Sequence, residues 1–207
     1  MEYDLDGINQ TQVDPKIDMT FARALRSILR QDPDVVMIGE IRDLETAQIA
    51  VQASLTGHLV LATLHTNDSV GAVTRLVDMG VEPYLLASSL LAVMAQRLMR
   101  RLCPECKVKY RPDSAELSIM EEGVSDLYGP AGCKKCDDIG YQGRTGIFEL
   151  LVVDDDIRHL IHDQAPEYEI RNHAVEKLSM VRLKDDAIRL VGKGNTSLSE
   201  ALRVTES

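Results

Sequence analysis

Two short apolar segments of this sequence end in residues that could act on a phosphate ester. The segment at 35–38 is followed by Gly-Glu-Ile-Arg-Asp, which places Glu40 just beyond it, and the segment at 59–64 is followed by His65 and Thr66. A carboxylate in this position can hold Mg²⁺ through water and help to orient an attacking water molecule. A histidine there could contact a γ-phosphate. Together the segments predict one side of a nucleotide-hydrolysing site.

Neither segment is specific alone, because apolar runs that end in an acid are common and a single histidine is more often structural. The case is stronger if the two segments are parallel neighbouring strands, joined through a crossover helix at 44–55. Glu40, His65 and Thr66 would then meet at the carboxyl ends of the strands, where open α/β sheets bind ligands. On this argument we favour a functional role for His65 over a structural one.

The cysteines form the most specific pattern in the sequence. They occur as two Cys-x-x-Cys pairs, Cys103 with Cys106 and Cys133 with Cys136. Two such pairs present four thiolates, which suits tetrahedral Zn²⁺, and four protein ligands leave no open position, so the metal would be structural. The alternative is a set of unligated or redox-active cysteines. Paired motifs favour the zinc site.

Arginines form a third pattern. Those on an expected helix at 19–31 recur at spacings of three and four, which places them on one stripe opposite the apolar face. Such a stripe is either a solvated basic face or a set of arginines directed at a nucleotide or a neighbouring subunit, as in oligomeric ATPases. The arginines on the helix are Arg23, Arg26 and Arg30, and Arg42 and Arg144 are further candidates for the second role.

The composition limits the classes of partner. The net charge is −10 and the pI is near 5.0, which argues against nucleic acid as the main partner. Aromatic residues make up 4% and Trp is absent, so a base-stacking platform is not expected. The start is acidic and polar, unlike a signal peptide. The longest apolar stretch, 84–95, is shorter than the roughly 20 residues that cross a bilayer. We expect a soluble, cytoplasmic protein.

The elements that must position these residues follow from apolar periodicity. We expect two buried strands, at 35–38 and 59–64, the first buried on both faces of a parallel sheet because it is apolar throughout. The alternation of strands with helices indicates an α/β layer. The expected helices lie at 19–31, 44–55, 70–79 and 83–101, with N-caps at Asp18, Asp43 and Ser69 and ends at Gly57 and Gly80.

The character of the sequence changes at Cys103. Residues 103–143 are rich in Cys, Lys, Gly and Pro and show little periodicity. A strand-like stretch follows at 144–153. The rest predicts short helices at 154–163, 166–177, 183–192 and 197–204, with Asp154 and Ser197 as caps.

Together these residues resemble the secretion-superfamily ATPases, which power type II secretion and type IV pilus assembly, and most closely the type II secretion ATPases of the GspE type. The resemblance covers essentially the whole chain. Its motifs are Ile-Asn-Gln-Thr-Gln-Val at 8–13, Asp-Met-Thr-Phe-Ala-Arg at 18–23, a Gly-Glu-Ile-Arg-Asp Walker B motif at 39–43, a His box at 57–68, the four cysteines, Gly-Arg-Thr-Gly at 143–146 and Thr-Ser-Leu-Ser-Glu-Ala at 196–201.

The resemblance implies an α/β fold in three parts. Residues 1–101 would be the C-terminal half of a RecA-like P-loop ATPase core with a mostly parallel sheet. Residues 102–143 would be a zinc-binding tetracysteine subdomain, and residues 144–207 a strand followed by a small α-helical C-terminal subdomain.

The resemblance also implies a function. The whole protein would be a hexameric cytoplasmic motor that hydrolyses ATP with Mg²⁺ and is peripheral at the inner membrane through secretion components such as proteins of the GspL and GspF types. Glu40 matches the Walker B acid, His65 the His-box histidine, and Arg42 would join them in catalysis. Residues implied at the nucleotide site or subunit interface are Arg26, Arg30, Arg144 and Thr66.

The sequence departs from the family pattern in one respect, since it contains no GxxxxGK[ST] loop to wrap the β- and γ-phosphates. We expect that loop upstream of Met1, and we expect this chain alone neither to bind ATP tightly nor to hydrolyse it. Three alternatives stay open. They are a type IV or mannose-sensitive pilus assembly ATPase, a non-catalytic zinc-containing interaction module, and a redox protein that uses its Cys-x-x-Cys pairs.

Overall fold

The computed structural model describes residues 5–17, 19–120 and 124–206. The chain divides into two compact units, each built from three segments. The first unit comprises Met1–Thr66, Ala72–Leu91 and Asp154–Pro166, and the second comprises Asn67–Gly71, Ala92–Val153 and Glu167–Ser207.

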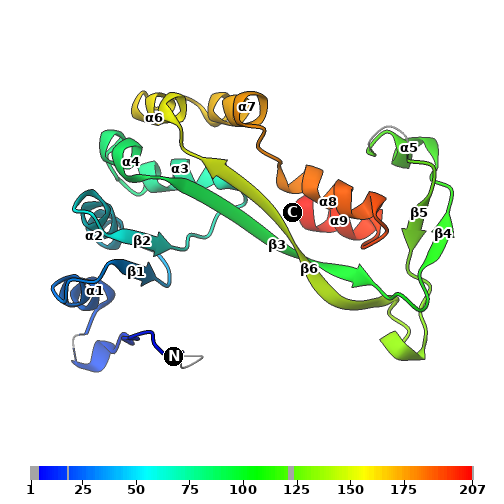
Figure 1. Ribbon diagram of the computed structural model, residues 1–207, viewed down its shortest axis with the longest axis horizontal. Helices are drawn as coiled ribbons and strands as arrows, with labels where there is room; N and C mark the ends of the chain where they lie inside the picture. Colours follow the sequence, from blue (N-terminus) through cyan, green and yellow to red (C-terminus); the bar gives the residue numbers. More distant parts are fainter. Residues whose placement is uncertain (1–4, 18, 121–123, 207) are drawn as a thin grey trace. The chain divides into compact units, whose positions relative to one another are not determined.

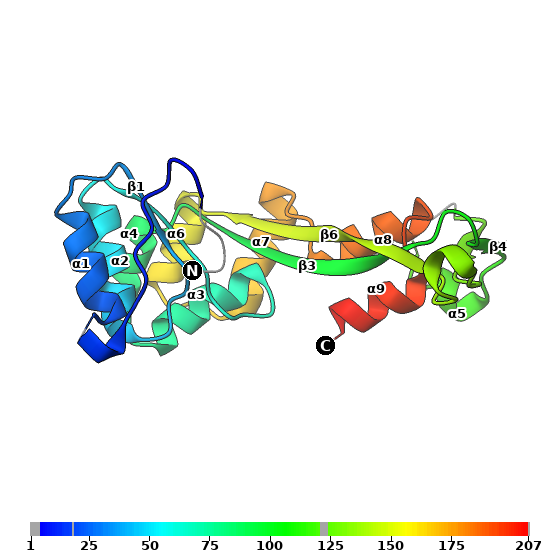
Figure 2. The same cartoon turned by 90° about the horizontal axis from the view of Figure 1, so that it is seen from below.

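The first unit contains a small parallel sheet (Figure 1) with helices packed beside it (Figure 2). Strands β1 and β2 pair in parallel, with Ile38 opposite Ala62. Helix α2 packs on α1, α4 and β2, and α4 packs on α6. The bounds are η1 Pro15–Ile17, α1 Phe21–Leu29, β1 Val35–Ile38, α2 Leu44–Leu55, β2 Leu59–Ala62, α4 Pro83–Ser89 and α6 Asp155–His162, and α3, Ser69–Asp78, begins in the second unit.

The predicted strands and α2 of this unit are confirmed. The Asp43 side chain accepts a hydrogen bond from the backbone of Thr46, which caps α2 as expected. Helix α1 is shorter than predicted and is capped by Thr20, which accepts from Arg23 N. Asp18, the expected cap, lies outside the described residues.

The prediction that β1 is buried on both faces is wrong for this chain. Val36 and Ile38 are buried, whereas Val35 and Met37 are 54% and 72% exposed. The expectation that the second strand is buried is also wrong, because β2 has no buried residue and Leu59 and Leu61 are exposed. Among the described residues, helices therefore cover one face of this sheet and leave an apolar face open.

The expected cap of α3 is also wrong. Helix α3 begins at Ser69 itself, and the carboxylate of Asp68 caps it by accepting from Gly71 N at 2.8 Å. Ser69 cannot serve as the cap because its hydroxyl donates to the carboxylate of Glu149 instead. The predicted end at Gly80 is confirmed, since Gly80 has a positive φ of 98°.

The second unit is built on a long antiparallel ribbon, β3 with β6. The predicted helix at 83–101 is therefore wrong beyond Ser89, because Ala92–Leu102 is strand β3. Pairing with β6 over most of its length overrides the local helical pattern. The described strands form three separate two-stranded sheets, of which only β1–β2 is parallel. The expectation of a mostly parallel sheet is therefore wrong for the described residues.

The C-terminal helices cover one face of this ribbon (Figure 1). Helix α8 packs on β6 and α9 packs on β3, and Met99, Ile147 and Val191 are fully buried in the core between them. The predicted strand at 144–153 and the four C-terminal helices are confirmed. The bounds are β3 Ala92–Leu102, β6 Tyr141–Val152, α7 Glu167–Leu178, α8 Leu183–Gly192 and α9 Leu198–Thr205.

In the sequence, the tetracysteine region connects the end of β3 to the start of β6. It holds a second, short antiparallel pair, β4 with β5. None of the helices within the described part of the chain is long and apolar enough to cross a membrane. The bounds in this region are β4 Val108–Tyr110, α5 Ser114–Leu117, β5 Leu127–Gly129 and η2 Lys134–Cys136.

Candidate functional site

The carboxylate of Glu40 lies between a histidine and an arginine at the ends of β1 and β2. Glu40 Oε1 is 2.8 Å from His65 Nε2, and Glu40 Oε2 accepts from Arg42 Nε at 2.7 Å. Two backbone links hold the strand ends together, because Ile41 N donates to Thr63 O at 3.0 Å and the Thr63 hydroxyl donates to Gly39 O. The expected meeting of Glu40 and His65 at one sheet edge is present.

This cluster is charged and open to solvent. The hydrogen bond and charge of Arg42 hold the pKa of Glu40 below its usual range, and Glu40 in turn raises the pKa of Arg42. The Glu40 side chain is 21% exposed, whereas those of His65 and Arg42 are 88% and 77% exposed. Two of the three side chains are therefore free to turn toward a ligand.

A pocket of about 510 Å³ opens beside Glu40 at the amino end of α2. The Asp43 carboxylate already caps that helix end, so the pocket presents two carboxylates, Glu40 and Asp43, beside the guanidinium of Arg42. Carboxylates can hold a divalent cation that a phosphate also ligates. This combination suits a metal-bound phosphate. The pocket is lined by Val13, Phe21, Gly39, Glu40, Arg42, Asp43 and Thr46.

The other predicted nucleotide or interface residues lie outside this pocket lining. Arg26 pairs with Glu45 of α2 at 2.8 Å, and Arg30 donates to the hydroxyl of Ser27 at 3.3 Å. Thr66 follows His65 directly. Arg144 belongs to the second unit, where it is exposed on β6 opposite Arg100.

The four cysteines of the second unit form a compact cluster that could hold a metal ion, since all four Sγ atoms lie within 4.8 Å of one another. The Cys103–Cys133 Sγ distance is 3.9 Å, and Cys136 Sγ is 3.7 Å from both Cys106 Sγ and Cys133 Sγ. A Zn–S bond of about 2.3 Å in tetrahedral geometry places its sulfurs roughly 3.8 Å apart. The spacing of the thiols thus fits a four-coordinate zinc site.

Backbone N–H groups stabilise the thiolate form of Cys136, whereas burial raises the pKa of Cys106 to about 12 and also raises that of Cys133. Burial raises the pKa of Cys136, but N–H donation to its sulfur from Cys133 and Gly140 outweighs burial and lowers that pKa to about 7. Gly140 has a φ of 80°, and a Cβ there would lie 2.4 Å from Pro130, so glycine is required. Lys135 of one Cys-x-x-Cys motif also pairs with Glu105 of the other at 2.8 Å.

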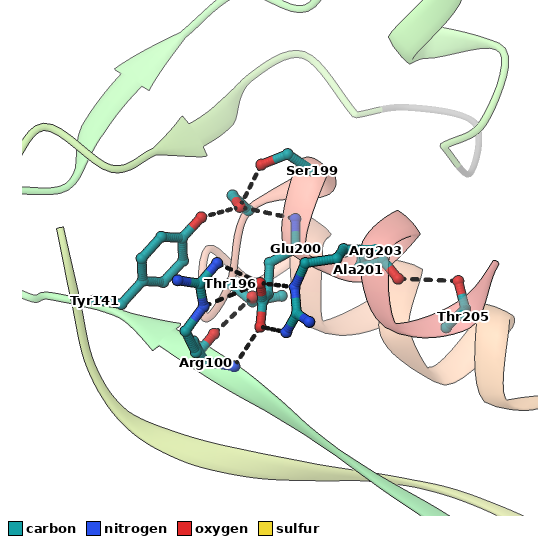
Figure 3. A network of polar contacts seen from close by, with 9 residues as sticks. Arg100, Tyr141, Thr196, Ser199, Glu200, Ala201, Arg203 and Thr205 are labelled. Atoms are coloured by element: carbon teal, nitrogen blue, oxygen red, sulfur yellow. Dashed lines mark hydrogen bonds and ion pairs between the residues drawn. The ribbon is translucent and has the colours of Figure 1, made fainter. Parts of the chain in front are cut away.

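The sequence did not predict a buried carboxylate network around Glu200 (Figure 3). Glu200 accepts from the backbone and the guanidinium of Arg100 and from Arg203. Arg100 also stacks on Tyr141, 4.3 Å from the ring centroid. The spacing of Ser197 and Glu200 matches a capping box, and Ser197 does cap α9. No local signal reveals that the Glu200 side chain turns instead to Arg100 in β3.

A family model described as "Type II/IV secretion system protein" matches residues 1–203. Among curated relatives, "Type II secretion system ATPase E" of Vibrio cholerae serotype O1 is 58% identical over 100% of this chain and 41% of the relative. "Type II secretion system protein E" of Pseudomonas aeruginosa is 59% identical over 99% of this chain and 41% of the relative. The chain thus spans well under half the length of these relatives.

Solved structures show the same fold. The pilus retraction motor PilT with bound ADP aligns with a TM-score of 0.64 at 27% identity, over 91% of this chain and 44% of that one. The Legionella pneumophila ATPase DotB aligns with a TM-score of 0.63 over 91% of this chain and 43% of that one, at 22% identity. The second likeness concerns the fold alone.

Proposed function

Because the chain belongs to the type II/IV secretion system protein family, we propose that it is one part of an ATPase that powers type II protein secretion. It would supply the Walker B and His-box side of the ATP site. The phosphate-binding loop would come from a segment outside these residues, as the greater length of the relatives supports. The related pilus motors share the fold, but the relatives of high identity are type II secretion proteins.

The observation that carries this proposal is the Glu40 cluster beside the pocket at the amino end of α2. Glu40 would hold Mg²⁺ and orient the attacking water. His65 shares the Glu40 carboxylate, which supports a role in contacting the γ-phosphate and responding to its loss. Arg42 would turn from Glu40 to the developing negative charge, since its side chain is exposed.

Phosphate release from ATP tests this assignment. We expect the purified whole protein to hydrolyse ATP and the 207-residue chain alone to show no turnover, because this sequence contains no P-loop to bind the phosphates. The family assignment to secretion is tested by expression of the whole gene in a strain that lacks its type II secretion ATPase. Restored secretion supports it, and restored pilus assembly in the corresponding pilus mutant with no secretion contradicts it.

We also propose an oligomeric state, a location and membrane partners for the whole protein. The whole protein would work as a hexamer on the cytoplasmic side of the inner membrane, bound through membrane partners of the secretion machine, with a RecA-like core and a helical C-terminal subdomain. Exposed arginines support a subunit interface, because a neighbouring subunit could use them at its nucleotide. The residues proposed for this role are Arg26, Arg30 and Arg144, with Thr66 at the nucleotide.

We also propose that the four cysteines hold one structural Zn²⁺. The sulfur spacing and the N–H donors to Cys136 support this, and four ligands leave no position for chemistry. Elemental analysis should find about one zinc per chain. A metal-free protein whose thiols exchange with disulfides would favour the redox alternative instead. Cys106→Ser should release the zinc, whereas Ser118→Ala, a surface hydroxyl variant in the same region, should retain it.

A further inference from the structure

Three consecutive residues, the last two of the His box and the one after it, are each held by a different element of the second unit. The side-chain oxygen of Asn67 accepts from Arg97 of β3 at 3.1 Å. The carboxylate of Asp68 accepts from Arg171 of α7 at 3.0 Å. The backbone N–H and the hydroxyl of Ser69 both donate to one oxygen of Glu149. We call these three residues, Asn67, Asp68 and Ser69, the clamped segment.

Glu149 is the most deeply buried of the groups that hold this segment. The residue is 2% exposed and lies on β6. Its second carboxylate oxygen accepts from the backbone N–H of Leu183 at 3.2 Å. One carboxylate therefore lies at the amino ends of both α3 and α8, where the first N–H groups of a helix lack partners within the helix. The two helix ends stabilise its negative charge, so the group resists displacement.

His65 has the opposite surroundings. Its side chain is 88% exposed, so little packing determines the direction of the ring. Only Thr66 separates it from the clamped segment. The backbone that leaves β2 is fixed on one side by pairing with β1 and on the other by the clamped segment. The orientation of an exposed ring then depends on how firmly both sides hold the backbone.

We propose that Glu149 is a positioning residue for His65, which fixes the direction of the imidazole toward Glu40 by holding the clamped segment. Loss of the Glu149 hydrogen bonds would loosen the clamped segment and, through Thr66, the backbone that carries the His65 ring. The proposal rests on the proposed function, because it assigns Glu149 a part in ATP hydrolysis. Its structural half, the effect of Glu149 on His65, can be measured without any nucleotide.

The first experiment uses this chain and no ATP. In Glu149→Gln the amides of Asn67, Ser69 and Leu183 should exchange hydrogen faster, and the NMR signal of the His65 ring should shift. Glu200→Gln is the matched control, because Glu200 is an equally buried carboxylate of the same unit that contacts none of the clamped segment. It should leave the His65 signal unchanged and should not speed exchange selectively at these three amides. An unchanged His65 signal in Glu149→Gln would overturn the proposal.

The second experiment uses the whole ATPase and a double-mutant cycle. Glu149→Gln should lower kcat roughly 10- to 100-fold, as small misplacements of catalytic groups do, with KM for ATP unchanged. In a background of His65→Asn it should cause no further loss, because its effect passes through His65. Glu200→Gln should leave kcat close to wild type and should not change the loss caused by His65→Asn. Multiplicative losses for Glu149→Gln and His65→Asn would overturn the positioning role.

A milder variant covers the case in which Glu149→Gln does not fold. Ser69→Ala removes only the hydroxyl donor and keeps the backbone N–H to Glu149. It should shift the His65 signal in the same direction by less, and no shift would count against the proposal. If the whole protein hydrolyses no ATP, the proposed function fails, while the exchange and NMR results still decide whether Glu149 orients His65.

Discussion

Glu40 in the first unit and Glu200 in the second are both glutamates bonded to arginine, and in both the pKa is lowered. Their surroundings differ. Glu40 is bonded to two exposed side chains and borders a pocket. Glu200 has a fully buried side chain that accepts from a backbone N–H and two guanidinium groups (Figure 3).

The difference shows how the same pair of residue types serves two purposes. A buried carboxylate whose acceptor sites are filled by residues of its own chain adds to stability and is closed to a ligand. An accessible carboxylate with exposed partners stabilises the fold little, because solvent screens the pair. That leaves it free to exchange its partners for a metal or phosphate. Activity should therefore depend on Glu40, and stability on Glu200.

The largest expected effect is on catalysis by the whole ATPase. Glu40→Gln keeps the shape of the side chain but removes its charge, so ATP hydrolysis should fall about 100- to 1,000-fold. Its free energy of unfolding should change little, because solvent screens the exposed pair. Phosphate release and urea unfolding measure the two quantities. A stability loss as large as that of Glu200→Gln would break the comparison.

The next largest effect is on stability. Glu200→Gln leaves Arg100 and Arg203 without their anion and should lower the free energy of unfolding by about 2–3 kcal/mol. We place the value below that for a fully buried pair because both guanidinium groups are partly exposed. Urea unfolding of the chain measures it. Residual hydrolysis by this variant close to wild type at low temperature, where it remains folded, would sharpen the contrast with Glu40.

Acid should reveal the same difference. Burial raises the pKa of Glu200, but hydrogen bonds from Arg203 and Arg100 outweigh burial and lower it from 4.5 to about 2. Because the folded-state pKa lies below the unfolded one, this stabilisation is complete above pH 4.5 and is lost as the pH falls toward 2. The Tm difference between wild type and Glu200→Gln should shrink over that range. A difference that stays constant would show that the charge of Glu200 contributes nothing.

The smallest expected effect is that of removing an exposed ion pair, and it gives a reference value for the stability contributed by such pairs. Arg26 and Glu45 are bonded at 2.8 Å with both side chains more than half exposed. Arg26→Ala should change the free energy of unfolding by less than about 0.5 kcal/mol. Urea unfolding in the same buffer gives the comparison with Glu200→Gln. A loss above about 1 kcal/mol would mean that surface pairs in this unit contribute more than the comparison assumes.

The sequence predicts elements well where the signal is local. The apolar run at 35–38, the Asp43 cap and Gly57 together predict β1 and α2, and these are present. Prediction fails where contacts with residues remote in the sequence determine the local structure. Residues 92–101 form strand because β6 pairs with them from far along the chain, and Ser69 leaves its expected cap role for Glu149. Whether a face of β1 is buried depends on which other elements pack on it, and the apolar run at 35–38 does not reveal that.

The residues of the candidate sites likewise fall into those with a local sequence signal and those without one. Glu40 and His65 were predicted to meet because both follow strands that pair, and a short crossover makes neighbouring strands probable in any α/β sheet. The four cysteines were predicted because their spacing is itself the signal. The partners of Glu149 and Glu200 could not be predicted, because each lies on an element remote in sequence and a single glutamate has no pattern.

The position of the tetracysteine cluster has a consequence for the order of folding. The last residue pair of the ribbon joins Leu102 to Tyr141, and Cys103 N donates to Gly140 O just beyond it. Without a link, β3 and β6 must meet across that whole intervening loop, which costs chain entropy before any pairing is gained. A metal bound by all four sulfurs would bring the two ends of this loop together. Pairing of β3 with β6 could then begin at Leu102 and Tyr141 and extend along the ribbon. We expect metal binding to precede strand pairing and to accelerate it.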